Sequence, residues 1–362
     1  MSHFHKLSIA DIRRETADCV SIAFAVPPQL KEAFEYRQGQ NITVRMHIGG
    51  EEVRRSYSIC SSPLENELRI AVKRVSGGLF STFANERLKA GQELEVLPPS
   101  GKFYTELKAG NRKNYLAFAA GSGITPVISL IKTTLAIEPE SHFTLVYGNR
   151  HRPSIIFREE LEALKNRYVH RLAVHHVLSR EQMDIPLNQG RIDIEKCAEF
   201  CPGLIHLPSV DEVFLCGPQE MIFTVSEWLQ QQGVAKKNIH FELFHTLENP
   251  PAGAGKSRTA VQAGAGTKGV SEVTVRLDGI SHVFRLPYDG ESVLNAALME
   301  GVDLPYACKG GVCCTCRAKL LEGDVEMDVN YALEADELAA GFILTCQSHP
   351  RTEKVVIDFD SR

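Results

Sequence analysis

The chain has 362 residues, 43% of them hydrophobic and 23% charged, and a net charge of −5. This composition is that of a globular protein and excludes a fibrous or disordered chain, while the length predicts two or three domains. We expect no membrane segment, because no apolar run approaches the roughly 20 residues of a membrane-spanning helix. The N-terminus lacks a signal-peptide pattern and the chain has ten cysteines, which together favour the reducing cytoplasm.

Residues 1–106 are predicted to form an antiparallel β-barrel. Short apolar or alternating runs such as ITVRMHI, VRRSYSIC and LRIAVKRV recur between Gly and Pro turns. Arg55 and Tyr57 share one face of a strand, and a cation beside an aromatic ring suits a ligand with a diphosphate and a flat ring. The segment GGLFS, residues 77–81, precedes a helix whose N–H groups can bind phosphate. Each signal alone also fits an ordinary strand or turn.

Residues 107–246 alternate strands with helices, which predicts a mostly parallel sheet with helices on both faces. The strand YLAFAA leads into GSGITP, residues 121–126, and then a helix. In this context a glycine loop can bind a diphosphate, although Pro126 departs from the G-x-G-x-x-G pattern. Cys216, Gly217 and Pro218 follow at the end of another strand, where such folds bind ligands. A buried core thiol is the alternative interpretation of Cys216.

Residues 247–269 are rich in Gly, Ala, Pro and Ser, and we expect a flexible linker there. Residues 270–362 then show a strand pair, an amphipathic helix, a cysteine-rich loop and further strands, as in an α+β ferredoxin domain. This last segment has 16 acidic and 8 basic residues. Its negative charge argues against nucleic acid as a partner and favours docking on a basic protein surface, although acidity can also serve solubility alone.

Four cysteines in this last segment carry the most specific signal. Cys308, Cys313 and Cys316 are spaced C-x4-C-x2-C and Cys346 follows, which is the plant-type [2Fe–2S] spacing. A structural zinc site usually has a second C-x2-C or His pair, and three sulfurs so close in sequence make a poor disulfide framework. Cys314 adjoins Cys313, so we expect its side chain to point away from the cluster.

The motifs RSYS, GGLFS, GSGITP, CGP and C-x4-C-x2-C occur in an order that resembles ferredoxin–NADP reductase-like flavoproteins fused to a C-terminal plant-type ferredoxin. The resemblance covers nearly the whole chain except the linker. It implies an oxidoreductase that passes electrons from NADPH through FAD to a [2Fe–2S] cluster. The implied cluster ligands are Cys308, Cys313, Cys316 and Cys346.

The resemblance also implies roles for individual residues. FAD would be bound by Arg55, Ser56, Tyr57 and Ser58 and capped by Gly78, Leu79, Phe80 and Ser81. The nicotinamide dinucleotide would be bound by Gly121, Gly123, Thr125, Pro126, Cys216, Gly217 and Pro218. The catalytic group beside the flavin, which tunes geometry and charge, would be Ser58, Cys216 and Glu242. Ser179 and Arg180 resemble a segment that binds the 2′-phosphate of NADPH, so NADPH is favoured over NADH, although a polar strand end is the alternative.

The C-terminal segment most resembles the reductase components of phenylacetyl-CoA epoxidases, which are multicomponent di-iron monooxygenases. The implied partner is therefore the oxygenase component of such a system. Two other functions stay open. The chain could serve a Rieske-type ring- or steroid-hydroxylating oxygenase, or it could be a flavin reductase that acts directly on a small acceptor.

Overall fold

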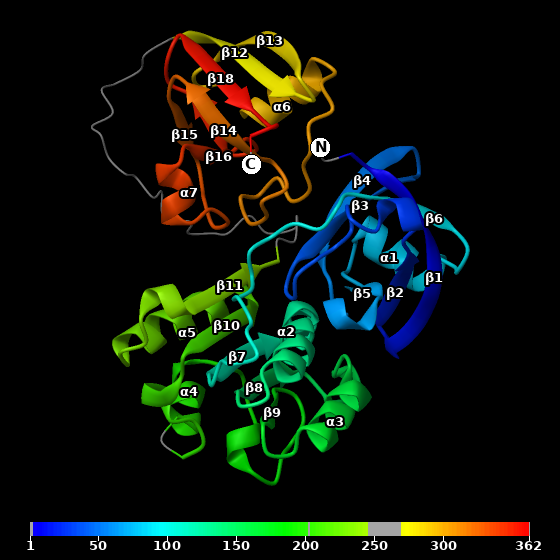
Figure 1. Ribbon diagram of the computed structural model, residues 1–362, viewed down its shortest axis with the longest axis vertical. Helices are drawn as coiled ribbons and strands as arrows, with labels where there is room; N and C mark the ends of the chain where they lie inside the picture. Colours follow the sequence, from blue (N-terminus) through cyan, green and yellow to red (C-terminus); the bar gives the residue numbers. More distant parts are fainter. Residues whose placement is uncertain (1–2, 202, 245–268, 362) are drawn as a thin grey trace. The chain divides into compact units, whose positions relative to one another are not determined.

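The computed structural model describes residues 3–201, 203–244 and 269–361. Residues 4–244 form one compact unit, and the residues from 269 onward belong to a second (Figure 1). The predicted linker, residues 247–269, lies outside the described residues except for Gly269. No helix in the described ranges is long and apolar enough to cross a membrane.

The first lobe of the larger unit is a six-stranded antiparallel sheet in the order β4-β3-β6-β1-β2-β5. Its strands are β1 (His5–Thr16), β2 (Cys19–Ala25), β3 (Asn41–Ile48), β4 (Glu51–Ser58), β5 (Leu68–Lys73) and β6 (Glu93–Val96). An antiparallel bridge between Ile59 and Ile70 joins the two ends of the sheet, which confirms the predicted barrel. Its interior is apolar and packs against α1 (Leu79–Glu86).

Two glycines fix the register of the β3–β4 hairpin. Gly49 and Gly50 both have positive φ, 63° and 90°, as a tight two-residue hairpin turn requires. The register set by this turn pairs Asn41 of β3 with Ser58 of β4. The hairpin therefore places an amide side by side with the serine of the RSYS motif.

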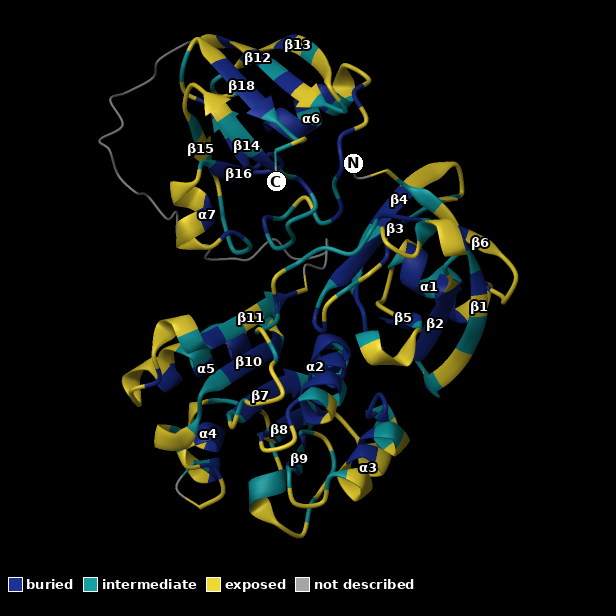
Figure 2. Cartoon of the chain, viewed as in Figure 1, coloured by how far each residue is buried: buried dark blue, intermediate teal, exposed yellow. Residues whose placement is uncertain are grey.

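The second lobe is a five-stranded parallel sheet in the order β11-β10-β7-β8-β9. Its strands are β7 (Asn114–Ala120), β8 (His142–Asn149), β9 (Leu172–Leu178), β10 (Glu212–Gly217) and β11 (Ile239–Leu243). One face is covered by α2 (Ile124–Ile137) and α3 (Arg158–Arg167), and the other by α4 (Ile194–Phe200) and α5 (Gln219–Gln231). The central strands are buried on both faces, as predicted (Figure 2). The seven-residue α4 was not predicted.

The second unit has a mixed five-stranded sheet in the order β13-β12-β18-β14-β16, in which only β12 and β18 run parallel. Its strands are β12 (Val270–Leu277), β13 (Ile280–Pro287), β14 (Arg317–Glu322), β16 (Phe342–Leu344) and β18 (Lys354–Asp358), with a separate pair of β15 (Val325–Met327) and β17 (Ser348–Pro350). The helices are α6 (Val293–Met299), which packs into the core, and α7 (Ala335–Ala339). The predicted α+β arrangement is confirmed.

Candidate active site and cluster loop

Ser58 and Glu242 meet at the seam between the barrel and the α/β lobe. Ser58 Oγ donates a hydrogen bond to Glu242 Oε2 at 2.7 Å, joining β4 to β11. Asn41, opposite Ser58 in the ladder, lies close enough to the Glu242 carboxylate to lower the pKa of that group. Asn41 Oδ1 accepts from Ser56 Oγ at 2.9 Å, which fixes the orientation of the Asn41 amide. The acidic group of one lobe is thus bound by Ser58 of the other lobe, with Asn41 nearby.

Burial adjusts the protonation of the groups at this seam. It raises the pKa of Glu242 to about 7, although the hydrogen bond from Ser58 and the nearby Asn41 side chain lower it. Glu242 can therefore take up or release a proton near neutral pH. Burial, together with the nearby Glu242 charge, raises the pKa of the Cys216 thiol well above its usual range. Cys216 consequently stays protonated, and a thiol is a poor nucleophile.

The glycine turn before α2 lies directly on the end of β10. Cys216 pairs with Glu242 in the β10–β11 register, and a Cβ on Gly123 would lie 2.0 Å from the Cys216 carbonyl oxygen. Only glycine permits this approach. The hydroxyl of Tyr147 donates to the Gly121 carbonyl at 2.9 Å and so holds the other end of the turn. The two motifs GSGITP and CGP, nearly 100 residues apart in sequence, thereby come together at the carboxyl edge of the sheet.

The remaining barrel residues of the candidate site gather around the start of α1. The rings of Tyr57 and Phe80 lie 5.5 Å apart between centroids. Ser81 Oγ accepts from the Val75 N–H at 3.1 Å and donates to the Gly78 carbonyl at 3.3 Å, which fixes the loop before the helix. The positive charge of Arg55, on the same strand face as Tyr57, is close enough to oppose the burial-raised pKa of that phenol. A cation, an aromatic face and a helix start are thus adjacent.

Ser179 and Arg180 lie farther along the same sheet edge. The backbone N–H and Oγ of Ser179 both donate to the Asn149 carbonyl, at 2.9 and 3.3 Å. The Arg180 N–H donates to the Arg150 carbonyl at 2.9 Å. Arg150 and Arg180 are both exposed at the ends of neighbouring strands β8 and β9. This pair of guanidinium groups is suited to a phosphate.

The four predicted cluster ligands gather at one loop of the second unit. The sulfurs of Cys308 and Cys313 are 3.2 Å apart, and the thiol of Cys346 is in contact with those of Cys308 and Cys316. The Gly310 N–H points at Cys308 Sγ, at 3.3 Å. Four thiols so close, with a backbone donor aimed at sulfur, are a donor set that fits an iron–sulfur cluster. The thiol of Cys314 instead approaches the Ala332 carbonyl at 3.4 Å, turned to another part of the chain.

Comparison with known proteins identifies the family to which the chain belongs. Three family models match the chain: an oxidoreductase FAD-binding domain over residues 6–104, an oxidoreductase NAD-binding domain over 118–227 and a 2Fe-2S iron-sulfur cluster binding domain over 275–351. The chain is 47% identical to a component protein of the 1,2-phenylacetyl-CoA epoxidase of Escherichia coli K12, covering 100% of this chain and 99% of that protein. It belongs to the family of oxygenase reductase components.

Other members of this reductase family have the same extent. The ferredoxin reductase component of 3-ketosteroid-9-alpha-monooxygenase from Rhodococcus rhodochrous is 36% identical over 98% of this chain and 96% of its own. A solved structure, phthalate dioxygenase reductase, has a TM-score of 0.58 at 24% identity and 98% coverage of both chains, which shows a shared fold. The predicted FAD, nicotinamide nucleotide and [2Fe–2S] cluster of a reductase fused to a ferredoxin are confirmed as a set. The choice between NADPH and NADH stays a prediction.

Three residues at the reductase site were not predicted from the sequence. Asn41 could have been found by counting back from the Gly49–Gly50 turn to the partner of Ser58. Arg150 directly follows β8, and Ser179 directly follows the neighbouring strand β9, so the position of Arg150 was a usable signal. Tyr147 looked like an ordinary buried strand residue, and no sequence pattern marked its hydroxyl as the partner of the glycine turn.

Replacing Gly123 with Ala tests the close approach of the turn to β10. The added Cβ would collide with the Cys216 carbonyl, so the turn must shift. We expect a lower melting temperature and a KM for the nicotinamide nucleotide raised about tenfold, a change of about 1.4 kcal/mol. Gly110→Ala is the control, because a Cβ at Gly110 meets no atom within 4 Å. Equal KM values for the two variants would contradict the assigned contact.

Glu242→Gln tests the raised pKa through stability. Between pH 4.5 and about 7 the folded chain keeps a proton on Glu242 that the unfolded chain has lost, so its ionisation lowers wild-type stability as the pH rises through this window. Glutamine does not ionise. The free energy of unfolding of the variant minus that of the wild type should therefore increase by up to about 3 kcal/mol between pH 4.5 and 8. Urea unfolding at several pH values measures it, and a difference independent of pH would disprove the shift.

Proposed function

We propose that the chain passes electrons from NADPH through FAD and its [2Fe–2S] cluster to the oxygenase component of a di-iron monooxygenase, phenylacetyl-CoA 1,2-epoxidase. The observation that carries the electron-transfer part is the meeting of Ser58, Glu242 and Cys216 at the seam of the FAD-binding and NAD-binding lobes. The identity of 47% with the Escherichia coli epoxidase component supports the choice of partner.

A second candidate partner is a steroid-hydroxylating oxygenase. It is favoured by the 36% identity with the ferredoxin reductase component of 3-ketosteroid-9-alpha-monooxygenase, which also spans nearly the whole chain. Direct reduction of a small acceptor by the flavin is the weaker alternative, because the cysteine loop of the second unit would then have no role in the reaction.

In this proposal the barrel residues hold and orient the flavin. When bound, FAD accepts two electrons at once from a reduced nicotinamide and returns them singly to the cluster. Arg55 would neutralise the diphosphate, and Tyr57 would flank the flavin ring. The loop that Ser81 fixes would cap the diphosphate, with Gly78, Leu79, Phe80 and Ser81 as its members. Ser58 would hold the Glu242 carboxyl group beside the ring, and Ser56 would orient Asn41 next to it.

The residues of the α/β lobe would bind the nucleotide. The turn formed by Gly121, Gly123, Thr125 and Pro126 offers backbone N–H groups to the diphosphate. Protonated, buried Cys216 would lie beside the nicotinamide without reacting, next to Gly217 and Pro218. Ser179 and Arg180, with Arg150, would bind the 2′-phosphate and so select NADPH.

The second unit would deliver the electrons. Cys308, Cys313, Cys316 and Cys346 would ligate the cluster, and the acidic surface of residues 270–362 would dock on a basic face of the oxygenase. We place the protein in the cytoplasm, because none of its ten cysteines forms a disulfide in the structure, as expected in a reducing compartment. In this proposal the flavin-binding segment is 1–106 and the nucleotide-binding segment is 107–246. The linker is 247–269 and the cluster-binding segment is 270–362.

Cys308→Ser separates relay through the cluster from direct reduction by the flavin. We expect NADPH-driven turnover of the purified phenylacetyl-CoA epoxidase oxygenase to fall at least 100-fold, because serine is a poor ligand for a cluster that prefers thiolates. NADPH oxidation by a dye that accepts electrons from the flavin should stay within about twofold. Cys314→Ser is the matched control and should leave both activities intact. Retained turnover in Cys308→Ser would refute the relay.

Arg180→Leu tests the nucleotide choice. A charged hydrogen bond to a phosphate contributes about 1.5–3 kcal/mol, so the KM for NADPH should rise about 10- to 100-fold while the KM for NADH changes little. Arg167→Leu serves as the control, because Arg167 is exposed at the end of α3 rather than at the carboxyl edge of the sheet. Equal effects of Arg180→Leu on both nucleotides would contradict 2′-phosphate binding.

A further inference from the structure

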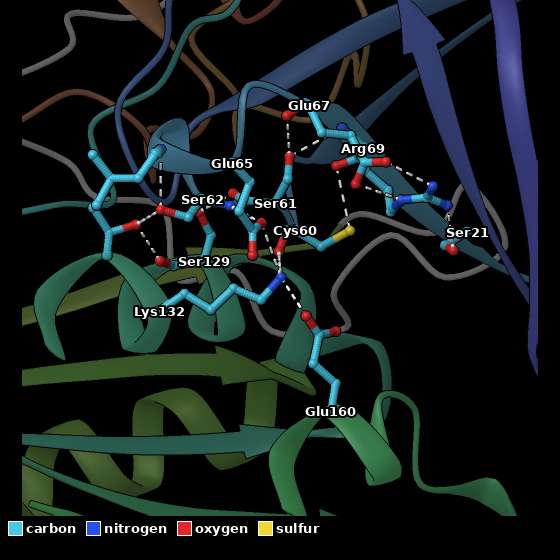
Figure 3. Close-up of polar contacts among 12 residues, drawn as sticks. Ser21, Cys60, Ser61, Ser62, Glu65, Glu67, Arg69, Ser129, Lys132 and Glu160 are labelled. Atoms are coloured by element: carbon cyan, nitrogen blue, oxygen red, sulfur yellow. Dashed lines mark hydrogen bonds and ion pairs between the residues drawn. The ribbon is translucent and has the colours of Figure 1, made fainter. Parts of the chain in front are cut away.

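Helix α2 docks on the barrel segment 60–65 through buried hydrogen bonds (Figure 3). Ser129 is fully buried, and its hydroxyl donates to the Ser61 carbonyl at 2.6 Å. The hydroxyls of Ser62 and Thr133 lie 2.9 Å apart. The Thr133 hydroxyl already donates to the Ser129 carbonyl at 2.7 Å, so Ser62 must be the donor to Thr133. The donor and the acceptor of each hydrogen bond in this contact are therefore determined.

Lys132, on the same helix face, completes the contact with a charge. Its ammonium bonds Glu65 at 3.2 Å and the Cys60 carbonyl at 3.5 Å on the barrel side, and Glu160 of α3 on the other (Figure 3). The side chain is only 10% exposed. Burial lowers the pKa of Lys132, but the two carboxylates raise it beyond its usual value, so the lysine is charged. We call Ser129, Lys132 and Thr133 with segment 60–65 the α2 clamp.

The clamp lies only a few residues along the chain from each of the two candidate cofactor sites. Ser129 is six residues beyond Gly123 of the nucleotide turn, or about 9 Å along a helix. On the barrel side, Ser61 is three residues beyond Ser58. The apolar residues around the clamp are shared as well, because Cys60 packs in the same cluster as Ile128 and Ile131 of α2. A displacement of α2 on the barrel would therefore move the nucleotide turn relative to the flavin strand.

We propose that the α2 clamp sets the approach of the nicotinamide to the flavin, with Lys132 as its principal positioning residue. The inference rests on the proposed function, since it assigns hydride transfer to this seam. The Ser58–Glu242 bond joins the lobes at the reacting end, and the clamp joins them again at Ser129, six residues along α2 from Gly123. With two separate attachments, the α/β lobe cannot rotate against the barrel about a single contact, as it could if only one attachment were present. A misplacement of about 1 Å at a reacting centre can slow a reaction about 100-fold.

The test compares Lys132→Met with Lys113→Met in the full-length holoprotein. Lys113 is a matched control because it forms a half-buried ion pair with Glu212 at 2.6 Å, wholly within the α/β lobe. Stopped-flow absorbance measures flavin reduction at saturating NADPH, and again with NADH. Calorimetry with 2′,5′-ADP measures binding to the α/β lobe alone, and melting temperature reports the loss of stability. Ser129→Ala, which removes one hydroxyl and no charge, is the second variant.

The clamp predicts at least a tenfold slower flavin reduction in Lys132→Met, with 2′,5′-ADP affinity and the later flavin-to-cluster step within twofold of wild type. Lys113→Met should melt at a lower temperature but reduce its flavin at the wild-type rate. Ser129→Ala should be slowed about threefold or more, and it decides the matter if Lys132→Met does not fold. Wild-type rates in Lys132→Met or Ser129→Ala, or equal slowing in Lys113→Met, would overturn the clamp. If neither nucleotide reduces the wild-type flavin, the proposed function itself fails.

Discussion

The hydrogen bond between Ser58 and Glu242 joins residues 184 positions apart and requires the barrel and the α/β lobe to be held in register. Several features of the larger unit serve that requirement. The Gly49–Gly50 turn sets which barrel residue stands beside Ser58, and Gly123 allows the nucleotide turn to rest on the strand adjoining Glu242. Because the bond is short and partly buried, a small displacement of either lobe would leave a polar group without its partner.

The protonation of the seam follows from the same packing. Burial keeps the Cys216 thiol neutral and brings the Glu242 carboxyl to a pKa of about 7. The seam thus offers one group that cannot attack a cofactor and one that can exchange a proton near neutral pH. At the loop of residues 308–316, the sulfurs of Cys308 and Cys313 lie together and the Gly310 N–H points at Cys308 Sγ, an arrangement that suits cluster ligands.

Local patterns in the sequence were sufficient for the fold class and for most candidate site residues. The cysteine spacing, the strand alternation and the glycine turns are all encoded within short windows. Asn41 was missed because its contact with Glu242 depends on strand pairing and on the meeting of two lobes. Ser129, Lys132 and Thr133 were missed because such side chains are ordinary on a helix, and only the docked segment 60–65 gives them partners. The short α4 lacked enough turns to show a clear period.

The central claim is that electrons entering from the nicotinamide leave through the iron–sulfur cluster of the same chain. Anaerobic titration of the purified full-length protein with NADPH, followed by visible absorbance and low-temperature electron paramagnetic resonance, tests it most directly. The account predicts that the flavin absorbance bleaches and that the signal of a reduced [2Fe–2S] centre rises toward one per chain. Complete bleaching of the flavin with no such signal, in protein that contains the cluster, would contradict it.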